Sequence, residues 1–270
     1  MVNPSRGDGW LGRSGNDGSA PQRIQAVDRA IELLKAVAGA VHPPTAAELA
    51  QICGLNRTTA WRLLATLEMN GMVERDLAQR YGVGYGAVAL SRSPSGSASL
   101  VRIARPALER LADETGNTVT LSVARREGVL AVDQIDPPDA TLVLTYLTQP
   151  LPVNATSTGK LLLSRLSDEE LDDVLIAPLE KLTEATVTDP ARLREIVAEV
   201  RRNGYAVTIC ELEVGVNGIS VAVVDEQDAL VAILSVSDTD HRLPARRLPS
   251  YVPAMRDAAE AIQRRLNDPR

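Results

Sequence analysis

Five side chains close together in the sequence have the chemistry to contact nucleic acid. Arginine and threonine hydrogen-bond to base edges and phosphates, and the N-terminus of a helix adds a partial positive charge that attracts phosphate. A solvated helix face that happens to carry an aromatic side chain is the alternative, and these residues alone do not decide between the two. The five residues are Arg57, Thr58, Thr59, Trp61 and Arg62.

Two short helices joined by a tight turn are predicted around these residues. Thr45 and Glu48 have the spacing of a capping box that starts the first helix, and Cys53-Gly54 is typical of a helix end. Asn56 is the expected N-cap of the second helix, which stops at Gly71. This helix-turn-helix pattern places the start of its second helix in the DNA major groove. The stripe that the second helix is expected to bury is Ala60, Leu63, Leu64 and Leu67.

Elements on either side extend the pattern to a winged domain. Upstream, apolar residues recur every three or four positions, which predicts an amphipathic helix with that stripe facing the core. Downstream, residues 72–75 and 80–83 predict a two-stranded hairpin, the wing, with Arg75 and Arg80 beside its turn. The upstream stripe is Ile24, Val27, Ile31, Leu34 and Val37.

Cap, wing and arm residues complete the candidate DNA-binding set. A wing uses arginine on phosphates or in the minor groove, although each arginine taken singly is more simply explained as a surface residue. An arginine at the start of the first helix can reach the DNA backbone from a flexible arm. The set is Arg23, Thr45, Asn56, Arg57, Thr58, Thr59, Trp61, Arg62, Arg75 and Arg80.

The charge distribution places polyanion binding in the first part of the chain. The net charge is −6, which alone does not favour DNA binding. Residues 1–105, however, hold 12 Lys/Arg against 8 Asp/Glu, whereas residues 106–270 hold 17 against 27. Phosphate contacts need cationic groups, so the positive first part is the expected DNA-binding part.

The bulk composition is that of a two-domain globular protein of a reducing compartment. The chain has 270 residues, 44% of them hydrophobic and 24% charged. Its start lacks the apolar core of a signal peptide, and no apolar run approaches the ~20 residues that cross a bilayer, so we expect a cytoplasmic protein without membrane contact. Cys53 and Cys210 lack a C-x-x-C spacing, and His42 and His241 are isolated. We therefore expect no disulfide framework, metal site or cofactor.

Changes in composition divide the chain. Residues 1–21 predict a disordered tail, residues 22–90 the winged helix-turn-helix domain, and residues 91–105 a serine-rich linker and linker helix. In residues 106–270, short strands alternate with helices, an α/β or α+β pattern, and the fold class expected for the whole chain is α+β. The strands are expected at 118–124, 130–135, 142–147, 219–224 and 229–236, and the helices at 101–115, from Asp189-Pro190 to Gly204, and at 252–266.

Two stretches of the second domain have the chemistry to bind a small molecule. Ser157-Thr158-Gly159-Lys160 fails the test for a phosphate-binding P-loop, because Asn154 and Leu161 stand where a glycine and a Ser/Thr are needed. A turn into a helix that offers amides to an anion remains possible, and so does a merely structural turn. Ser235 and Ser237 lie two apart on an expected strand, so both hydroxyls point to one face. Cys210, beside acidic residues but in no catalytic motif, is expected to be a small buried thiol.

Taken together, the sequence resembles the IclR family of bacterial regulators. The matching stretches run from about Arg23 to Leu266, and their order and spacing carry the resemblance. They are RIQAVDRAIELL in the first helix, TAAELAQICGLNRTTAWRLLATLEMNGMVER across the helix-turn-helix, RYGVG in the wing, and then ARPALERLADETGNTV, NATSTGKLLL, TDPARLREIVAEVRRNGYAV, EVGVNGIS and LSVSD.

This resemblance implies a winged helix-turn-helix that dimerises, a linker helix and a GAF-like α/β domain that binds an effector. Members of the family commonly associate as dimers of dimers, and their effectors are usually small organic acids or aromatic compounds from a catabolic pathway. Carried over onto this sequence, the resemblance places the effector pocket at Thr158, Gly159, Thr208, Cys210, Asn217, Gly218, Ser235 and Ser237.

The sequence departs from the family pattern in this pocket. Thr208-Ile209-Cys210 replaces most of an acidic run, of which Glu211 is retained, and Asn217-Gly218 replaces an Arg-Cys pair. The resemblance thus implies a less polar and roomier pocket, which favours an apolar or aromatic effector over a small keto acid.

Three functions are compatible with these observations. The first is a DNA-binding transcriptional repressor whose operator binding is modulated by a small catabolic metabolite. The second is an enzyme that acts on a small molecule in the C-terminal domain, although the sequence shows no recognisable catalytic set. The third is a constitutive repressor whose pocket binds nothing. A steep salt dependence of DNA affinity distinguishes the first from the second.

Overall fold

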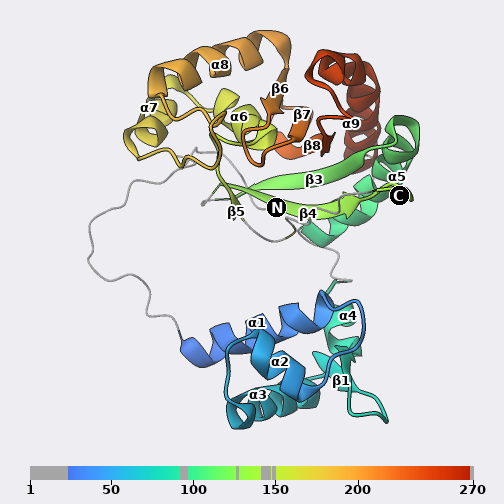
Figure 1. Ribbon diagram of the computed structural model, residues 1–270. Coiled ribbons are helices and arrows are strands. Elements are labelled where there is room, and N and C mark those ends of the chain that lie inside the picture. The colour runs from blue at the N-terminus through green and yellow to red at the C-terminus, as the bar shows by residue number, and fades with distance from the viewer. Residues whose placement is uncertain (1–23, 92–96, 126–127, 141–146, 148–149, 268–270) are drawn as a thin grey trace. The chain divides into compact units, whose positions relative to one another are not determined.

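The computed structural model describes residues 24–91, 97–125, 128–140, 147 and 150–267 (Figure 1). The chain forms two compact units, divided between Ser99 and Leu100, inside helix α5, Ser97–Thr115. We call them the N-terminal unit and the C-terminal unit. The tail predicted at residues 1–21 lies outside the described residues.

In the N-terminal unit, three helices and a hairpin pack around one apolar core, and a further helix follows the hairpin. Leu33, Leu49 and Leu64 come from the three helices and are fully buried, and Tyr81 of the hairpin packs on the same core. The two strands pair antiparallel, which confirms the predicted wing. The elements are α1 Gln25–Ala38, α2 Ala46–Ile52, α3 Arg57–Met69, β1 Val73–Arg75, β2 Tyr81–Val83 and α4 Tyr85–Ser91.

Both helices of the helix-turn-helix are capped as the sequence predicts. The Glu48 amide donates to Thr45 Oγ1 at 3.3 Å, and the Glu48 carboxylate accepts from the Thr45 amide at 2.7 Å. Asn56 Oδ1 accepts from the Thr59 amide at 2.8 Å. In the turn between the helices, Gly54 has a φ of +60°, a left-handed conformation that favours glycine.

The buried face of α1 agrees with the expected stripe only in the second half of the helix. Val37 is buried and Leu34 packs against the core, as predicted, and Leu33 joins them. Ile24, Val27 and Ile31 are instead 68%, 52% and 47% exposed, so the prediction is wrong for these three residues. Periodicity finds an apolar stripe but does not show how much of it a partner covers.

A six-stranded antiparallel sheet forms the centre of the C-terminal unit, in the order β5-β4-β3-β8-β7-β6. Helices α5 and α9 cover one face through the largest core cluster, and α6 and α8 cover the other, with α7 packed on both of them (Figure 1). The strands are β3 Thr118–Arg125, β4 Gly128–Ile135, β5 Pro150–Leu151, β6 Tyr205–Ile209, β7 Val216–Val224 and β8 Leu230–Thr239. The other helices are α6 Ser157–Ser164, α7 Asp168–Ile176, α8 Pro190–Asn203, the 3-10 helix η1 Ala245–Tyr251 and α9 Val252–Asn267.

Local signals placed most elements of this unit. Helix α8 starts at the Asp189 cap and ends at Gly204, whose φ is +75°, and the helix expected at 101–115 begins four residues earlier, at Ser97. The strand expected at 142–147 falls almost wholly outside the described residues, although Leu147 bridges to Ala131. Strand β6 and helix α7 were not predicted.

Candidate DNA-contact surface and ligand cavity

The first two turns of α3 present the predicted DNA-binding side chains to the outside. Ala60 and Leu64 hold one side of the helix in the core, so Arg57, Thr58, Trp61 and Arg62 project from the other. Trp61 is 58% exposed. The side chains of Arg57 and Arg62 make no hydrogen bond or ion pair with any residue that the structure describes, so both are available to DNA. Thr59, in contrast, is half-buried.

The two cap residues of the candidate set serve the protein's own backbone. The hydroxyl of Thr45 also donates to Glu48 at 2.9 Å, so both its polar functions are used within the capping box. The side-chain carbonyl oxygen of Asn56 accepts a hydrogen bond from the first turn of α3. These residues therefore orient the recognition helix, whatever else they contact.

The wing arginines are held by neighbours within their own unit. Arg75 Nη1 donates to Gln79 Oε1 at 2.7 Å and its Nε lies 3.4 Å from Glu68. Arg80 Nη1 donates to the Pro43 carbonyl at 2.8 Å and lies 3.9 Å from Glu48. Arg80 thus ties the wing to the segment before α2. Arg23, the other candidate, lies outside the described residues.

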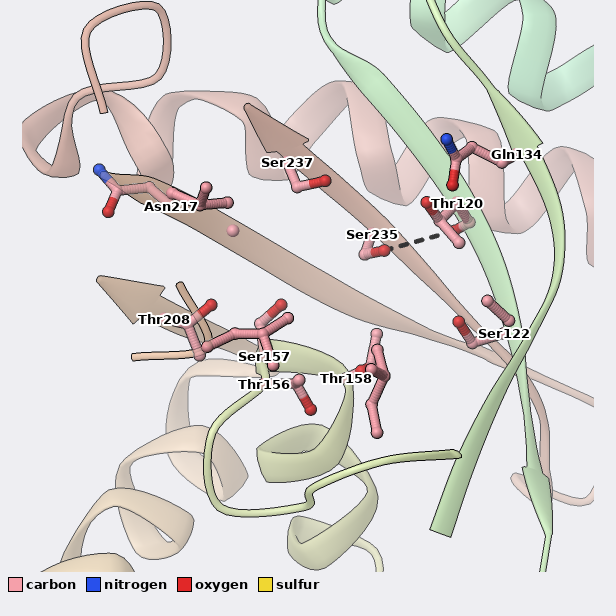
Figure 2. A pocket seen from close by; sticks show the side chains of 15 residues that line it. Thr120, Ser122, Gln134, Thr156, Ser157, Thr158, Thr208, Asn217, Ser235 and Ser237 are labelled. Atoms are coloured by element: carbon pink, nitrogen blue, oxygen red, sulfur yellow. Dashed lines mark hydrogen bonds between the residues drawn. The ribbon is translucent and has the colours of Figure 1, made fainter. Parts of the chain in front are cut away.

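A cavity of about 70 Å³ lies in the C-terminal unit between the sheet and the start of α6 (Figure 2). Hydroxyl groups from three directions converge on it: from β3 and β8 of the sheet, from α6, and from the end of β6. None of the described residues that line it is charged. They are Thr120, Ser122, Ala131, Gln134, Leu151, Thr156, Ser157, Thr158, Thr208, Leu212, Val216, Asn217, Gly218, Ser235 and Ser237.

Most of the predicted pocket residues meet at this cavity. Ser235 and Ser237 line it, while Leu234 and Val236 point into the core on the other face of the sheet, as the alternation along the strand predicts. The Ser235 hydroxyl lies 3.5 Å from the Thr120 carbonyl (Figure 2). The other predicted residues among the lining are Thr158, Thr208, Asn217 and Gly218.

Two predicted pocket residues do not line the cavity. A Cβ on Gly159 would lie 2.4 Å from the backbone of Val153, so this glycine lets α6 pack against the preceding strand segment. Cys210 is half-buried rather than buried, with a φ of +55°, and its Sγ lies 3.7 Å from Asn217 Oδ1. The close packing of Gly159 thus gives it a structural role, and anion binding by the neighbouring amides of α6 stays a prediction.

Three hydroxyl side chains that line the cavity have no hydrogen-bond partner among the described residues. Ser122, Thr158 and Thr208 are 3%, 6% and 6% exposed, and their hydroxyls make no hydrogen bond with any described residue. By contrast, Ser157 Oγ lies 2.7 Å from Ser220 Oγ, and Thr156 Oγ1 caps the Gly159 amide at 3.0 Å. The other amides in the first turn of α6 have no acceptor within the helix. The cavity therefore offers hydrogen-bond donors and acceptors to a small molecule.

The sequence could have indicated two of the lining residues that it missed. Thr120 and Ser122 alternate with buried apolar residues along β3, as Ser235 and Ser237 do along β8. The same period-two argument applies to both strands. What the sequence does not give is that β3 pairs with β8, with Thr120 opposite Ser235.

A buried ion pair anchors the loop that closes one end of the cavity. Lys160 is 2% exposed, and its Nζ lies 2.5 and 2.6 Å from the two carboxylate oxygens of Glu211. Burial lowers the pKa of Lys160, and the adjacent Glu211 opposes that shift. Lys160 belongs to α6 and Glu211 to the loop after β6, so the pair fixes Thr208 and Leu212 against the start of α6.

An exposed recognition helix on a winged helix-turn-helix, joined to a second α+β unit, defines a DNA-binding transcriptional regulator of two domains. The chain belongs to the IclR family: residues 26–77 match the IclR helix-turn-helix domain, and residues 95–264 match the C-terminal domain of bacterial transcriptional regulators of IclR type. Among the helices that the structure describes, none is long and apolar enough to cross a membrane.

Relatives agree with this assignment along most of their length. The chain is 28% identical to the transcriptional repressor IclR of Escherichia coli over 248 residues, which covers 90% of each chain. It is 30% identical to the HTH-type transcriptional regulator BhcR of Paracoccus denitrificans, over 93% of this chain and 91% of that protein. An IclR homolog from Microbacterium hydrocarbonoxydans, crystallised with 4-hydroxybenzoate, superposes with a TM-score of 0.73 at 26% identity, over 90% of this chain and 99% of that chain.

Proposed function

We propose that this regulator acts in the cytoplasm as a homodimer or dimer of dimers that represses transcription, and that a small effector in the cavity changes its affinity for its operator. Three hydroxyls that line the cavity without a hydrogen-bond partner among the described residues carry the effector part of this proposal, because a ligand in the cavity can supply those hydrogen bonds. Repression is favoured because the similar Escherichia coli and Salmonella typhimurium proteins are named repressors.

The DNA contact is made by the start of α3. Arg57, Thr58, Trp61 and Arg62 are exposed together there, in the part of a recognition helix that enters the major groove. A homodimer matches its symmetry to that of its operator, so the half-sites should lie about one helical turn, or a multiple of it, apart. Footprinting that shows one protected half-site, unaffected by scrambling its neighbour, would contradict the dimeric arrangement.

The effector is a compact molecule held by hydrogen bonds and not by an ion pair. The described lining carries hydroxyls and amides without a charged side chain. None of these residues could therefore form an ion pair with a carboxylate of the effector. A cavity of about 150 Å³ admits benzene, and this one encloses about half that volume. An aromatic effector, of the size of the 4-hydroxybenzoate in the crystals of the Microbacterium homolog, therefore requires the cavity wall to move outward.

The C-terminal unit senses and does not catalyse. A hydroxyl nucleophile needs a general base within hydrogen-bond reach, and no histidine or carboxylate is among the described residues that line the cavity. The alternative, an enzymatic function, predicts that the protein converts a bound compound. Mass spectrometry of the ligand recovered after incubation with the protein would detect the product.

Two measurements test the proposal. The first is DNA affinity against salt, with a duplex that the protein itself selects from a random pool. Several phosphate contacts should make log K fall linearly and steeply with log salt, and a flat response would contradict DNA binding. The second is a thermal-shift comparison of 4-hydroxybenzoate, pyruvate and glycerol. Stabilisation by one of them should vanish in the S235A/S237A variant, and stabilisation that survives would place the ligand elsewhere.

A further inference from the structure

Strand β4 carries a bulge at the wall of the cavity. Ser122 pairs with Ala131 and Leu121 pairs with Asp133, so Val132 is an extra residue in the ladder. Side chains of a regular strand alternate between faces, and the extra residue resets the alternation. Ala131 and Gln134 line the cavity, whereas Asp133 lies on the face of the sheet that α5 covers.

On that face, Asp133 is bound to the first half of α5. Arg105 Nη1 donates to Asp133 Oδ1 at 2.7 Å, while Arg105 Nε also binds the exposed Glu109 at 3.1 Å. Asp133 is 7% exposed, and its Oδ2 is buried without a hydrogen-bond partner. Burial raises the pKa of this carboxyl, against the effect of Arg105. A half-satisfied buried carboxylate is an unfavourable arrangement, so a purely structural contact is a poor explanation for it.

The helix that Asp133 holds is the one through which the chain passes between the units. Helix α5 starts at Ser97, and the division between the units falls two residues later. The Arg105–Asp133 contact therefore joins the cavity wall to the covalent connection with the DNA-binding unit.

The unpaired oxygen gives this contact a second arrangement. Arginine and carboxylate groups prefer to pair through two parallel hydrogen bonds, but here one oxygen is used. A small displacement of the bulge relative to α5 would bring Oδ2 within reach of the guanidinium. The structure shows the one-bond form, and a ligand that presses on Ala131 and Gln134 would bias the contact between this form and a two-bond form.

We propose that Asp133 is a positioning residue that couples the cavity to DNA binding. When the β4 bulge moves, the number of hydrogen bonds between Asp133 and Arg105 changes from one to two. This inference depends on the effector-controlled function proposed above. It adds the route by which a change in the cavity reaches the DNA-binding unit, which runs through the β4 bulge, Asp133 and Arg105 to helix α5.

A side chain that fills the cavity can replace the unidentified effector in the test. We would measure the affinity of the full-length protein for its selected duplex, with and without Ser235→Leu, in the wild type and in Asp133→Asn. We expect filling to change DNA affinity by at least about fivefold in the wild type, the lower range of allosteric coupling. In Asp133→Asn, whose amide keeps one acceptor but cannot pair through two oxygens, that change should disappear.

Glu109→Gln is the matched control, because it removes the negative charge of the other partner of Arg105 without touching the sheet. The effect of filling should persist in it. An equal effect of Ser235→Leu with and without Asp133→Asn, or its loss in Glu109→Gln, would overturn the proposal. Thermal melting checks that each variant is folded, and Ser237→Leu is the second filling variant if the first fails. A folded, filled protein with unchanged DNA affinity would also overturn the coupling, whereas a wild type that selects no duplex would contradict the proposed function itself.

Discussion

Helices α3 and α6 both begin with a side-chain N-cap, which is exposed to solvent in α3 and enclosed in the protein in α6. In each, an N-cap oxygen accepts the amide three residues on: Asn56 for Thr59 in α3, and Thr156 for Gly159 in α6. Two further polar residues follow each cap. Arg57 and Thr58 of α3 are exposed, whereas Ser157 and Thr158 of α6 line a cavity whose described residues carry no charge.

The exposure and charge around each helix start, more than the N-cap itself, determine what the helix start can bind. Both starts offer free amides and a partial positive charge. At α3, the open surface and two cationic side chains suit a polyanion. At α6, enclosure excludes any macromolecule and leaves room for a small one. The predictions below test this contrast, from the largest expected effect to the smallest.

The glycines near the two starts should differ most. Gly159→Ala places a Cβ 2.4 Å from the Val153 backbone, and neither side can relax easily, so we expect a loss of at least about 3 kcal/mol of unfolding free energy. Gly54→Ala meets no atom within 4 Å and only strains a φ of +60°, which costs about 1 kcal/mol. Urea unfolding monitored by hydrogen exchange in each unit measures both. Equal losses would remove the contrast in packing.

Arginine substitutions should separate DNA contact from support of the wing. Arg62→Ala removes an exposed, unpaired cation, so DNA affinity should fall by about 1 to 3 kcal/mol if a base is contacted, and the salt slope should shrink by about one unit if a phosphate is contacted. The protein should remain as stable as the wild type, because Leu64 and not Arg62 fills the core.

Arg80→Ala is the control for that experiment. Its guanidinium is bound to the Pro43 carbonyl, so we expect a small loss of stability and an unchanged salt slope. A slope that changes in Arg80→Ala and not in Arg62→Ala would move the DNA contact from the recognition helix to the wing.

Removal of the two caps should be smaller and unequal in effect. Asn56→Ala leaves an exposed helix start and should cost about 1 kcal/mol of stability. Thr156→Ala should cost more, because its buried hydroxyl also donates to the Pro152 carbonyl at 3.0 Å. Thermal unfolding compares them, with Asn56→Asp and Thr156→Ser as conservative controls that should restore most of the loss. A larger loss at the exposed cap would contradict the comparison.

The exposed capping box should also respond to pH. Hydrogen bonds from Thr45 lower the pKa of Glu48 below its ordinary value of 4.5. The stabilisation by this carboxylate is therefore present above that value and is lost as pH falls through the lowered pKa. The advantage of the wild type over Glu48→Gln should disappear in that acidic range, which unfolding experiments at several pH values measure. An advantage that persists in strong acid would count against the carboxylate as its source.

Features determined by neighbouring residues could be predicted from the sequence. The caps at Thr45, Asn56 and Asp189 depend on side chains within three positions of the backbone that they bind, and all three form as expected. The alternation that sends Ser235 and Ser237 to the cavity is equally local. These signals hold because no distant partner is needed to make them.

Features that depend on distant partners could not be predicted. The part of the α1 stripe that is buried depends on the positions of α2 and α3, which the sequence of α1 does not give. Gly159 belongs to the matching motif, but its contact with Val153 removes it from the cavity. The two arginines of the wing looked free because Pro43 and Glu68 are not beside them in the sequence.

The pairing of β3 with β8 has a consequence for how the chain is made. Thr120 lies opposite Ser235, so the middle of the sheet cannot form until the ribosome has synthesised about 115 more residues, roughly 6 to 23 s at bacterial or slower rates. The N-terminal unit, by contrast, has all its strands and helices by Ser91. Its hairpin joins neighbouring strands, and the hydrogen bond between Arg80 and Pro43 spans only 37 residues, so its pairings can form sooner. For several seconds the nascent chain therefore contains the complete N-terminal, DNA-binding unit without the C-terminal unit that we propose controls its DNA affinity.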